Sequence, residues 1–386
     1  MPPEAPLPAV PQADPRAAYL EQRAAIEAVI AAVLARGRYV LGPETAGFET
    51  EFAAAMGCRH AIGVGSGTDA LILALRALGV RPGEWVATVS HTAVATVAAI
   101  EAVGARPLLV DIDPATFTMD AAELARTLDA PPLGERVAAV LAVHLYGHPA
   151  DLEAITSLTQ RHRVPLVEDC AQAHGATFAG RPVGSFGNVA CFSFYPTKNL
   201  GALGDGGALT TNDDGMAAEL RALREYGWRE RRHVSERAGI NSRLDELQAA
   251  VLRVKLPRLG LDNARRRAIA ARYDAELAGL ALLRPQRDRR ISHVFHQYVV
   301  RCAGRDGVRA RLQAAGIGTG VHYPVPVHRQ PAYVGRLAHG PGGLGHTERV
   351  AAEILSLPIY PQLENGAIDH VVAALRAACP RRDGQV

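Results

Sequence analysis

The chain has 386 residues, 48% of them hydrophobic, and a formal net charge of +3. This length and apolar content can bury a large core and suggest two or three domains. Arginines are spread along the whole sequence together with acids, and the runs at 229–232 and 265–267 are short. No basic stripe of the kind that binds nucleic acid is present, so we expect no nucleic-acid partner.

The cellular compartment follows from the cysteines and from the start of the chain. The five cysteines lack CxxC spacing, which suits free buried thiols better than disulfides or a zinc site. The start MPPEAPLPAVPQADP has neither the cationic segment nor the apolar core of a signal peptide. No apolar run approaches membrane-spanning length. We therefore expect a cytoplasmic protein with no membrane partner.

The first half of the chain predicts alternating strands and helices. A proline-rich segment, residues 1–13, is expected to be disordered, and Asp14 then caps a helix that ends at Gly37. From residue 60, continuous apolar strands alternate with helices. The strands are expected at 61–64, 84–89, 105–111, 137–143 and 165–170, and the helices at 65–79, 92–103, 120–128 and 151–161. This pattern predicts a mostly parallel mixed sheet whose catalytic groups gather at the carboxyl ends of its strands.

Helices predominate after residue 212. They are expected at 215–226 and 244–280, the second broken near Pro257 and Gly260. A strand in HVFHQYVVRC (293–302) and a helix at 306–315 then indicate a smaller α+β domain. We therefore predict a large α/β domain over residues 14–260 and a small C-terminal domain, with its linking helix, over residues 261–386.

Only two of the 42 Lys+Arg residues are lysines, Lys198 and Lys255. A lysine with a lowered pKa can attack a carbonyl and form a Schiff base, whereas arginine cannot be deprotonated in a protein. Lys198 follows an apolar, aromatic run and precedes a glycine-rich turn, so we expect its amine at a strand end. Lys255 lies on an arginine-dotted helix, where we expect an ordinary surface residue.

The motif GSGTDAL (65–71) closes a strand and opens a helix. Backbone amides at a helix N-terminus, with the hydroxyls of Ser66 and Thr68, can bind a phosphate. Ser193, five positions before the lysine, can contact the same phosphate. A common glycine-rich helix cap and a buried strand serine are the structural alternatives for these residues.

The motif VEDCAQAHGA (167–176) places Glu168 and Asp169 at the end of an apolar strand. A carboxylate there can hold a heteroaromatic nitrogen protonated, and Gln172 can reach a ring oxygen, although a helix cap is an alternative reading. With the phosphate motif and Lys198, these residues meet the three needs of pyridoxal phosphate, whose pyridinium acts as an electron sink.

Segments over nearly the whole chain, from about residue 39 to 361, resemble the sugar aminotransferases of the DegT/DnrJ/EryC1/StrS group. The resemblance implies a pyridoxal-phosphate enzyme of fold type I with an aspartate-aminotransferase-like fold. The segments are GSGTDALILALRALG, SHTAVATVAAIEAVGARPLLVDID, VHLYGHPADLEAI, EDCAQAHGA, CFSFYPTKNLGALGDGGALTTND, GINSRLDELQAAVLRVKL and GIGTGVHYPVPVH.

The resemblance also implies roles for single residues. Lys198 would bond covalently to the cofactor and later move the proton, Asp169 would pair with the pyridine nitrogen, and Gln172 would touch the ring hydroxyl. The active site would lie at a homodimer interface, because one of the phosphate ligands would come from the neighbouring subunit. The phosphate ligands would be Gly67, Thr68, Ser193 and, from that subunit, Asn241.

The loop GVHYPVPVH matches the family segment that helps to hold the amino donor or the sugar, through His322, Tyr323 and His328. The pairs His144 with His148 and His322 with His328 also raise the question of a metal. Neither pair is joined by acids or cysteines at ligand spacing, so we expect no metal.

The sequence departs from the family at two positions. Many relatives have an aromatic residue that stacks on the cofactor ring at the position of Ala93. Either a neighbour such as His91 covers that face or the cofactor is held more loosely, so we assign no stacking residue. Ile240 stands where relatives often have tyrosine.

The resemblance implies a ping-pong transamination from glutamate or glutamine to a keto group of a nucleotide-linked deoxysugar. YPTKNLGALGDGG is most similar to enzymes that act at C3 of a dTDP-3-keto-6-deoxyhexose. Amination at C4, or of a keto-cyclitol such as scyllo-inosose, is the alternative within enzymes. A non-catalytic regulatory or sugar-binding protein is a remote alternative. The catalytic-type residues Lys198, Asp169 and Gln172 argue against it, as does the lack of a helix-turn-helix with a basic face.

Overall fold

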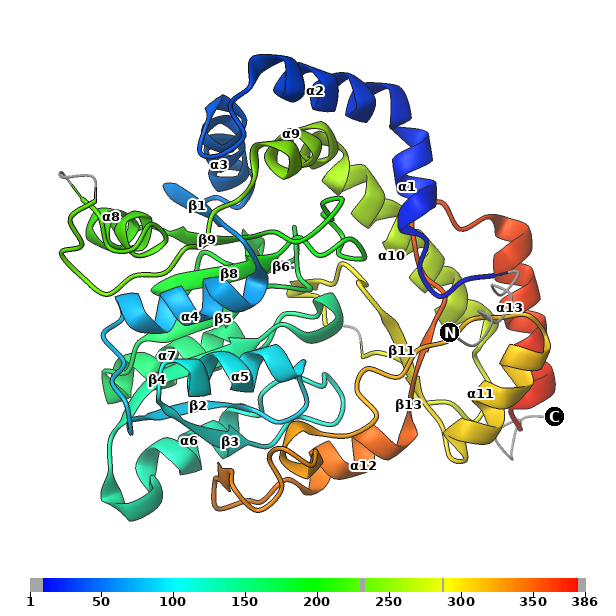
Figure 1. The fold of residues 1–386 in the computed structure, drawn as a ribbon. Helices are drawn as coiled ribbons and strands as arrows, with labels where there is room; N and C mark the ends of the chain where they lie inside the picture. Colours follow the sequence, from blue (N-terminus) through cyan, green and yellow to red (C-terminus); the bar gives the residue numbers. More distant parts are fainter. Residues whose placement is uncertain (1–9, 230–232, 287, 381–386) are drawn as a thin grey trace.

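The computed structural model describes residues 10–229, 233–286 and 288–380 (Figure 1). Residues 1–9 of the segment expected to be disordered lie outside these ranges. Val10 is buried and forms an isolated bridge with Ile317. Within the described residues, no helix combines the length and the apolar character needed to cross a membrane.

One eight-stranded sheet organises the larger part of the molecule, in the order β1-β9-β8-β5-β4-β2-β3-β12. From β8 to β12 neighbouring strands are parallel, whereas β9 is antiparallel to both β1 and β8. The predicted mostly parallel mixed sheet is confirmed. Its strands are β1 (His60–Val64), β2 (Trp85–Val89), β3 (Arg106–Val110), β4 (Val137–Val143), β5 (Leu166–Asp169), β8 (Val189–Ser193), β9 (Gly207–Thr211) and β12 (Ala338–His339).

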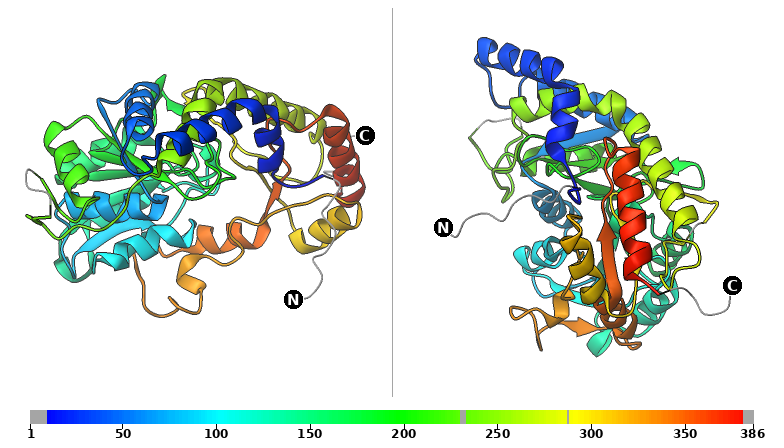
Figure 2. Two further views of the ribbon diagram at one scale, coloured as in Figure 1. Left: turned by 45° about the horizontal axis from the view of Figure 1, so that its top comes forward. Right: turned by 90° about the vertical axis from the view of Figure 1, so that its right-hand side faces the viewer.

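The strands are apolar because both faces of the sheet are covered. Every residue of β2 is buried, and helices lie on either side of the sheet (Figures 1 and 2). The covering helices are α4 (Gly67–Ala77), α5 (Val94–Ala102), α6 (Ala121–Asp129), α7 (Leu152–His162) and α8 (Asp214–Leu223). Polar side chains can therefore meet at the ends of the strands, where the sequence predicts the catalytic groups.

Two sets of helices flank this domain. The helix predicted between Asp14 and Gly37 is broken at Gln22, and α2 and α3 pack against α9. One 3-10 turn that contains Pro257 separates α9 from α10, which confirms the predicted break, since proline lacks an amide proton. The helices are α1 (Pro15–Glu21), α2 (Arg23–Arg36), α3 (Pro43–Ala55), α9 (Glu246–Lys255) and α10 (Leu259–Glu276).

A second apolar core is built from α10, the C-terminal elements and Val10. The strand predicted over 293–302 is shorter than expected, because Phe295 has a positive φ of 45° and the chain turns there before β11. β11 pairs antiparallel with β13, and Figure 1 shows α11 and α13 beside them. The elements are β11 (Tyr298–Arg301), α11 (Arg305–Ala314), α12 (Gly345–Glu353), β13 (Ile354–Leu357) and α13 (Asn365–Ala378). A small separate sheet comprises β6 (Thr177–Phe178), β7 (Arg181–Pro182) and β10 (Ile291–Ser292).

Candidate active site

A cavity of about 230 Å³ opens beside the carboxyl ends of β4, β5 and β8 and the N-terminus of α4. The segments that follow parallel strands meet at one edge of a sheet, which is why distant motifs come together here. Six of the residues singled out in the sequence line this cavity: Gly67, Thr68, Asp169, Gln172, Ser193 and Lys198.

Lys198 lies in the loop between β8 and β9, where its amide donates a hydrogen bond to the carbonyl of Tyr195 at 2.9 Å. Burial lowers the pKa of Lys198 to about 8, against a smaller opposing effect of the Asp169 carboxylate. At pH 7 roughly a tenth of such amines are neutral, far more than for an ordinary lysine. The side chain is therefore prepared for attack on a carbonyl.

Asp169, the last residue of β5, is buried and faces the cavity. Its Oδ1 accepts from the amide of Ala171 at 3.1 Å and its Oδ2 from the hydroxyl of Thr96 at 3.2 Å. Burial raises the pKa of Asp169, while the Ala171 amide and the Lys198 ammonium act to lower it. Two donors leave part of the acceptor capacity of a carboxylate unused, so a cationic group of a ligand can still pair with it.

Glu168, the preceding residue, is fully buried and saturated with hydrogen bonds. Its two oxygens accept from His144 Nε2 at 3.1 Å and from the amides of Gly184, Phe186 and Gly187 at 2.7 to 2.8 Å. Burial acts to raise the pKa of Glu168, but the contacts with His144 and the backbone amides lower it overall. This carboxylate is an anchor for the segment around Gly184.

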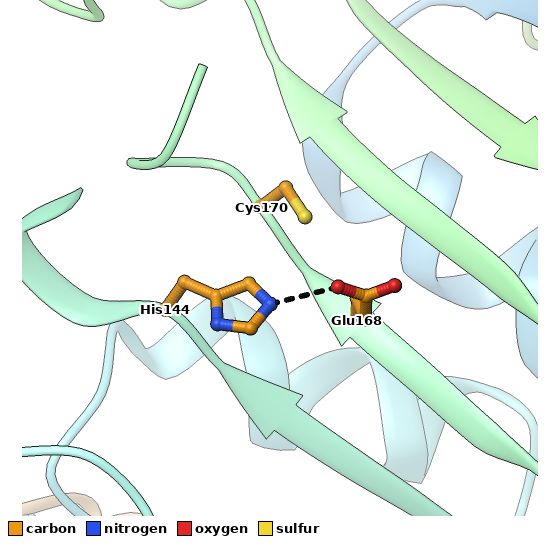
Figure 3. Close-up of side chains that lie close together, drawn as sticks. All are labelled: His144, Glu168 and Cys170. Carbon is orange, nitrogen blue, oxygen red and sulfur yellow. Dashed lines mark hydrogen bonds and ion pairs between the residues drawn. The ribbon is translucent and has the colours of Figure 1, made fainter. Parts of the chain in front are cut away.

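His144, Glu168 and Cys170 bring three ligand-type atoms within 4.8 Å of one another (Figure 3). His144 Nδ1 accepts from the amide of Ala150 at 3.0 Å, so its Nε2 carries the proton that it donates to Glu168. Burial also raises the pKa of the Cys170 thiol well above its ordinary value. Hydrogen bonding thus accounts for this cluster, and neither ring nitrogen of His144 is left for a metal.

The N-terminus of α4 and the end of β8 form one wall of the cavity. Ser66 caps the helix by accepting from the amide of Asp69 at 3.1 Å, and the preceding helix amides have no partner within the helix. A Cβ at Gly67 would lie only 2.6 Å from Cβ of Ser193, so glycine allows this close approach. Amides, a positive dipole end and hydroxyls together suit a phosphate.

Tyr146 connects the cavity residue Gln172 with His322 and was not singled out from the sequence. Its amide donates to Gln172 Oε1 at 2.7 Å, and its hydroxyl donates to the carbonyl of His322. Gln172 Nε2 in turn donates to the hydroxyl of Tyr323 at 3.3 Å. Because Tyr146 follows the carboxyl end of β4, the strand-end rule that drew attention to Asp169 could also have identified it.

Four of the predicted site residues do not line the cavity. His322 and Tyr323 are linked to it through Tyr146 and Gln172, and His328 and Asn241 lie further away. His328 Nδ1 is 2.7 Å from the Ser90 hydroxyl and its Nε2 is 3.0 Å from Glu348. His328 therefore anchors its own loop. Asn241 is exposed and forms an isolated bridge with Glu225.

The structure tests His91, the neighbour suggested to cover the face that Ala93 leaves open. Ala93 lines the cavity, whereas His91 does not and is only 1% exposed. His91 Nε2 lies 2.8 Å from the hydroxyl of Tyr146, which holds the ring away from the cavity. His91 therefore does not cover the face that alanine leaves open.

The expectation that Lys255 is an ordinary surface residue is wrong. Its Nζ donates a 2.6 Å hydrogen bond to the carbonyl of Gly201, in the same loop as Lys198. Burial lowers the pKa of Lys255 to about 8. Periodicity on an arginine-rich helix could not reveal this contact, because it depends on how α9 packs against a distant loop.

The strand-end lysine, the neighbouring acid and the amides at the N-terminus of α4 are the groups that a pyridoxal-phosphate-dependent enzyme needs. Comparison with known proteins gives the family. The profile of the DegT/DnrJ/EryC1/StrS aminotransferase family matches residues 21–376, and the chain belongs to this family.

Individual relatives are similar over almost their whole length. The dTDP-3-amino-3,4,6-trideoxy-α-D-glucose transaminase of Streptomyces venezuelae is 48% identical, over 97% of this chain and 98% of that protein. The crystal structure of DesV from S. venezuelae superposes with a TM-score of 0.92 at 48% identity and covers 97% of this chain and all of that one. Bacillus subtilis ntda, solved with bound cofactor PMP, has a TM-score of 0.85 at 29% identity, over 93% and 82% of the two chains.

Proposed function

We propose that this aminotransferase moves an amino group from glutamate or glutamine to the C3 keto group of a dTDP-linked 3-keto-6-deoxyhexose. The name of the 48% identical relative supports both the nucleotide sugar and the position of the amine. The observation that carries the chemistry is the placement of Lys198, with its lowered pKa, in one cavity with Asp169.

The cavity fits the cofactor residue by residue. We assign the phosphate to Gly67, Thr68 and Ser193, because the N-terminal amides of α4 and the end of β8 line the same cavity. A side chain at Gly67 would collide with Ser193. Asp169 would hold the pyridine nitrogen protonated and Gln172 would contact the ring hydroxyl. When bound, pyridoxal phosphate supplies an electron sink for the bonds broken at the substrate carbon.

Attachment of the cofactor and the proton transfer are assigned to Lys198. The amine of Lys198 would hold the cofactor, and the same nitrogen would act as base and then as acid for the proton that moves at the substrate carbon. Its lowered pKa serves both tasks, because a group that titrates near the working pH can accept and release a proton.

The segment with His322 and Tyr323 is assigned to the amino donor or the sugar. Burial lowers the pKa of His322 to about 4, and its Nδ1 lies 2.8 Å from the Ser356 hydroxyl, so the ring is neutral at pH 7. Burial also raises the pKa of Tyr323 to about 12, which keeps its hydroxyl protonated as a donor. His328 would contribute by holding this loop to Ser90.

We further propose a homodimer with shared active sites, in which Asn241 completes the phosphate site of the partner. Asn241 is exposed in the single chain, as are the side chains of Tyr195, Leu203 and Tyr226. Burial of these apolar groups against a second copy would stabilise the pair. We also propose two domains, over residues 14–260 and 261–386. The five free cysteines support a cytoplasmic location.

Turnover assays test the acceptor. The protein is incubated with glutamate or glutamine and, separately, with a dTDP-3-keto-6-deoxyhexose, a dTDP-4-keto-6-deoxyhexose and scyllo-inosose, and the aminated product is identified by mass. We expect the 3-keto sugar to have the highest kcat/KM. Preference for the 4-keto sugar or the cyclitol would assign the protein to the alternative branch, and no amination of any of them would contradict the proposal.

A further inference from the structure

One face of the α9–α10 segment lies against the loop that carries Lys198. Side chains spaced seven and eight residues apart on this segment, about two helical turns, point to the same side. They meet alternate residues of the loop in reverse order: Gln248 with Leu203, Lys255 with Gly201, and Asn263 with Asn199.

The central contact is the shortest of the three. Lys255 Nζ donates to the carbonyl of Gly201 at 2.6 Å, and the outer contacts are both 2.8 Å. Gly201 is buried, and a Cβ there would lie 2.4 Å from the carbonyl oxygen of Pro196. The loop therefore closes on itself between Pro196 and Gly201, with Lys198 inside the closed turn. A group that fixes the Gly201 carbonyl fixes this turn.

The use of lysine at position 255, where arginine is the usual cation of this chain, also supports a specific role. The chain uses arginine for nearly all of its 42 Lys+Arg positions. Of its two lysines, one lies in this turn and the other donates a hydrogen bond to it. Arg253 and Arg258, on the same helical stretch as Lys255, instead pair with the acids Glu51 and Glu21. Lys255 points its amine at a backbone carbonyl and borders a cavity of about 50 Å³ that also touches Lys198.

We propose that Lys255 is a positioning residue, which holds the Lys198 turn in its reactive geometry through the Gly201 carbonyl. Lys255 does not line the cavity of about 230 Å³ and acts through the backbone of Gly201. This inference rests on the proposed role of Lys198. The flanking contacts of Gln248 and Asn263 limit the motion of the turn, and Lys255 fixes its centre.

The experiment compares Lys255→Met, which keeps the length and removes the donor, with Lys255→Arg, which keeps a donor and can use the neighbouring cavity. Arg258→Met, three residues further along and bonded to Glu21, is the matched control. Two quantities are measured: hydrogen exchange of the amides of residues 195–206 in the apoprotein, and kcat and KM of the loaded enzyme.

In Lys255→Met we expect exchange in this loop to accelerate and kcat to fall about tenfold, the effect of one lost hydrogen bond, with KM changed less than twofold. Lys255→Arg should recover most of kcat, and the control should match the wild type. Normal exchange and normal kcat in a folded Lys255→Met protein would overturn the inference. So would equal losses in the Arg258→Met control.

If Lys255→Met does not fold, Gln248→Ala removes the flanking contact to Leu203 from a half-buried position, and the same acceleration of exchange is expected on a smaller scale. An unchanged exchange rate of the loop amides in Gln248→Ala would contradict the inference that the α9–α10 segment restrains the turn. The exchange measurement needs no substrate. A wild-type protein without aminotransferase activity would therefore refute the proposed function and leave the positioning role to be judged separately.

Discussion

Glu168 and Asp169 are consecutive carboxylates on β5, yet they serve opposite sides of the sheet. Successive side chains of a strand point to opposite faces, so Asp169 faces the cavity and Glu168 faces the segment around Gly184. Glu168 accepts from four protein donors and its pKa is lowered, whereas Asp169 accepts from two and its pKa is raised. The difference teaches that a buried acid whose acceptor capacity the protein fills is structural, and that an underused one is reserved for a ligand.

The largest effect on the cavity side is expected for Lys198→Arg. This change keeps a cation and removes the only amine that can bond to the cofactor, so kcat should fall on the order of 10⁴-fold or more. Steady-state assays with saturating cofactor measure it. Thermal unfolding of the apoprotein serves as the control and should shift little. Activity within tenfold of the wild type would remove Lys198 from the mechanism.

The two acids can be compared directly by amide substitution. Asp169→Asn should lower kcat about 100-fold at nearly unchanged stability, because it removes the charge that faces the cofactor ring. Glu168→Gln should reduce the free energy of unfolding by about 3 kcal/mol, because its amide group meets backbone donors that require an acceptor. Urea unfolding and kcat per folded molecule separate the two effects. The reverse pattern would invert the assignment of the two faces.

Gly67→Ala should weaken cofactor binding about tenfold, since the new methyl group must displace Ser193 or the phosphate. The dissociation constant of pyridoxal phosphate, from absorbance titration, measures the effect. Gly260→Ala is the matched control, because a Cβ there meets nothing within 4 Å. Equal binding by both variants would place the phosphate elsewhere.

The pKa of Lys198 predicts a pH dependence for cofactor uptake. The neutral amine is the reacting form, so the uptake rate of the apoprotein should rise with pH and reach half its maximum near pH 8. The Asp169 carboxylate raises this pKa, so in Asp169→Asn the midpoint should move to lower pH. Stopped-flow absorbance records both profiles. A midpoint near 10 in the wild type would mean that the amine is not buried.

The smallest effect concerns the cluster of His144, Glu168 and Cys170. Since hydrogen bonds occupy both nitrogens of His144, a chelator should leave kcat and the melting temperature unchanged. Elemental analysis of the purified protein provides an independent check. A stoichiometric metal whose removal lowers stability would show that His144, Glu168 and Cys170 form a metal site.

The sequence predicted much of this arrangement for a physical reason. Continuous apolar runs define a buried parallel sheet, and such a sheet gathers its polar strand ends at one edge, so Asp169, Ser193 and Lys198 could be brought together from spacing alone. The spacing of residues in the sequence does not predict which side chains from distant segments form hydrogen bonds with one another. The hydrogen bonds of Tyr146 to Gln172 and of Lys255 to Gly201 depend on tertiary packing, and so does the burial that turns His91 away from the cavity.

Covalent labelling tests the central claim most directly, because the chain offers only two lysine amines. Apoprotein loaded with pyridoxal phosphate is reduced with borohydride, which fixes the cofactor to the amine that holds it, and the labelled peptide is located by mass spectrometry. The account predicts one label per chain on Lys198 and none on Lys255. A label on Lys255, or no lysine label at all, would contradict it.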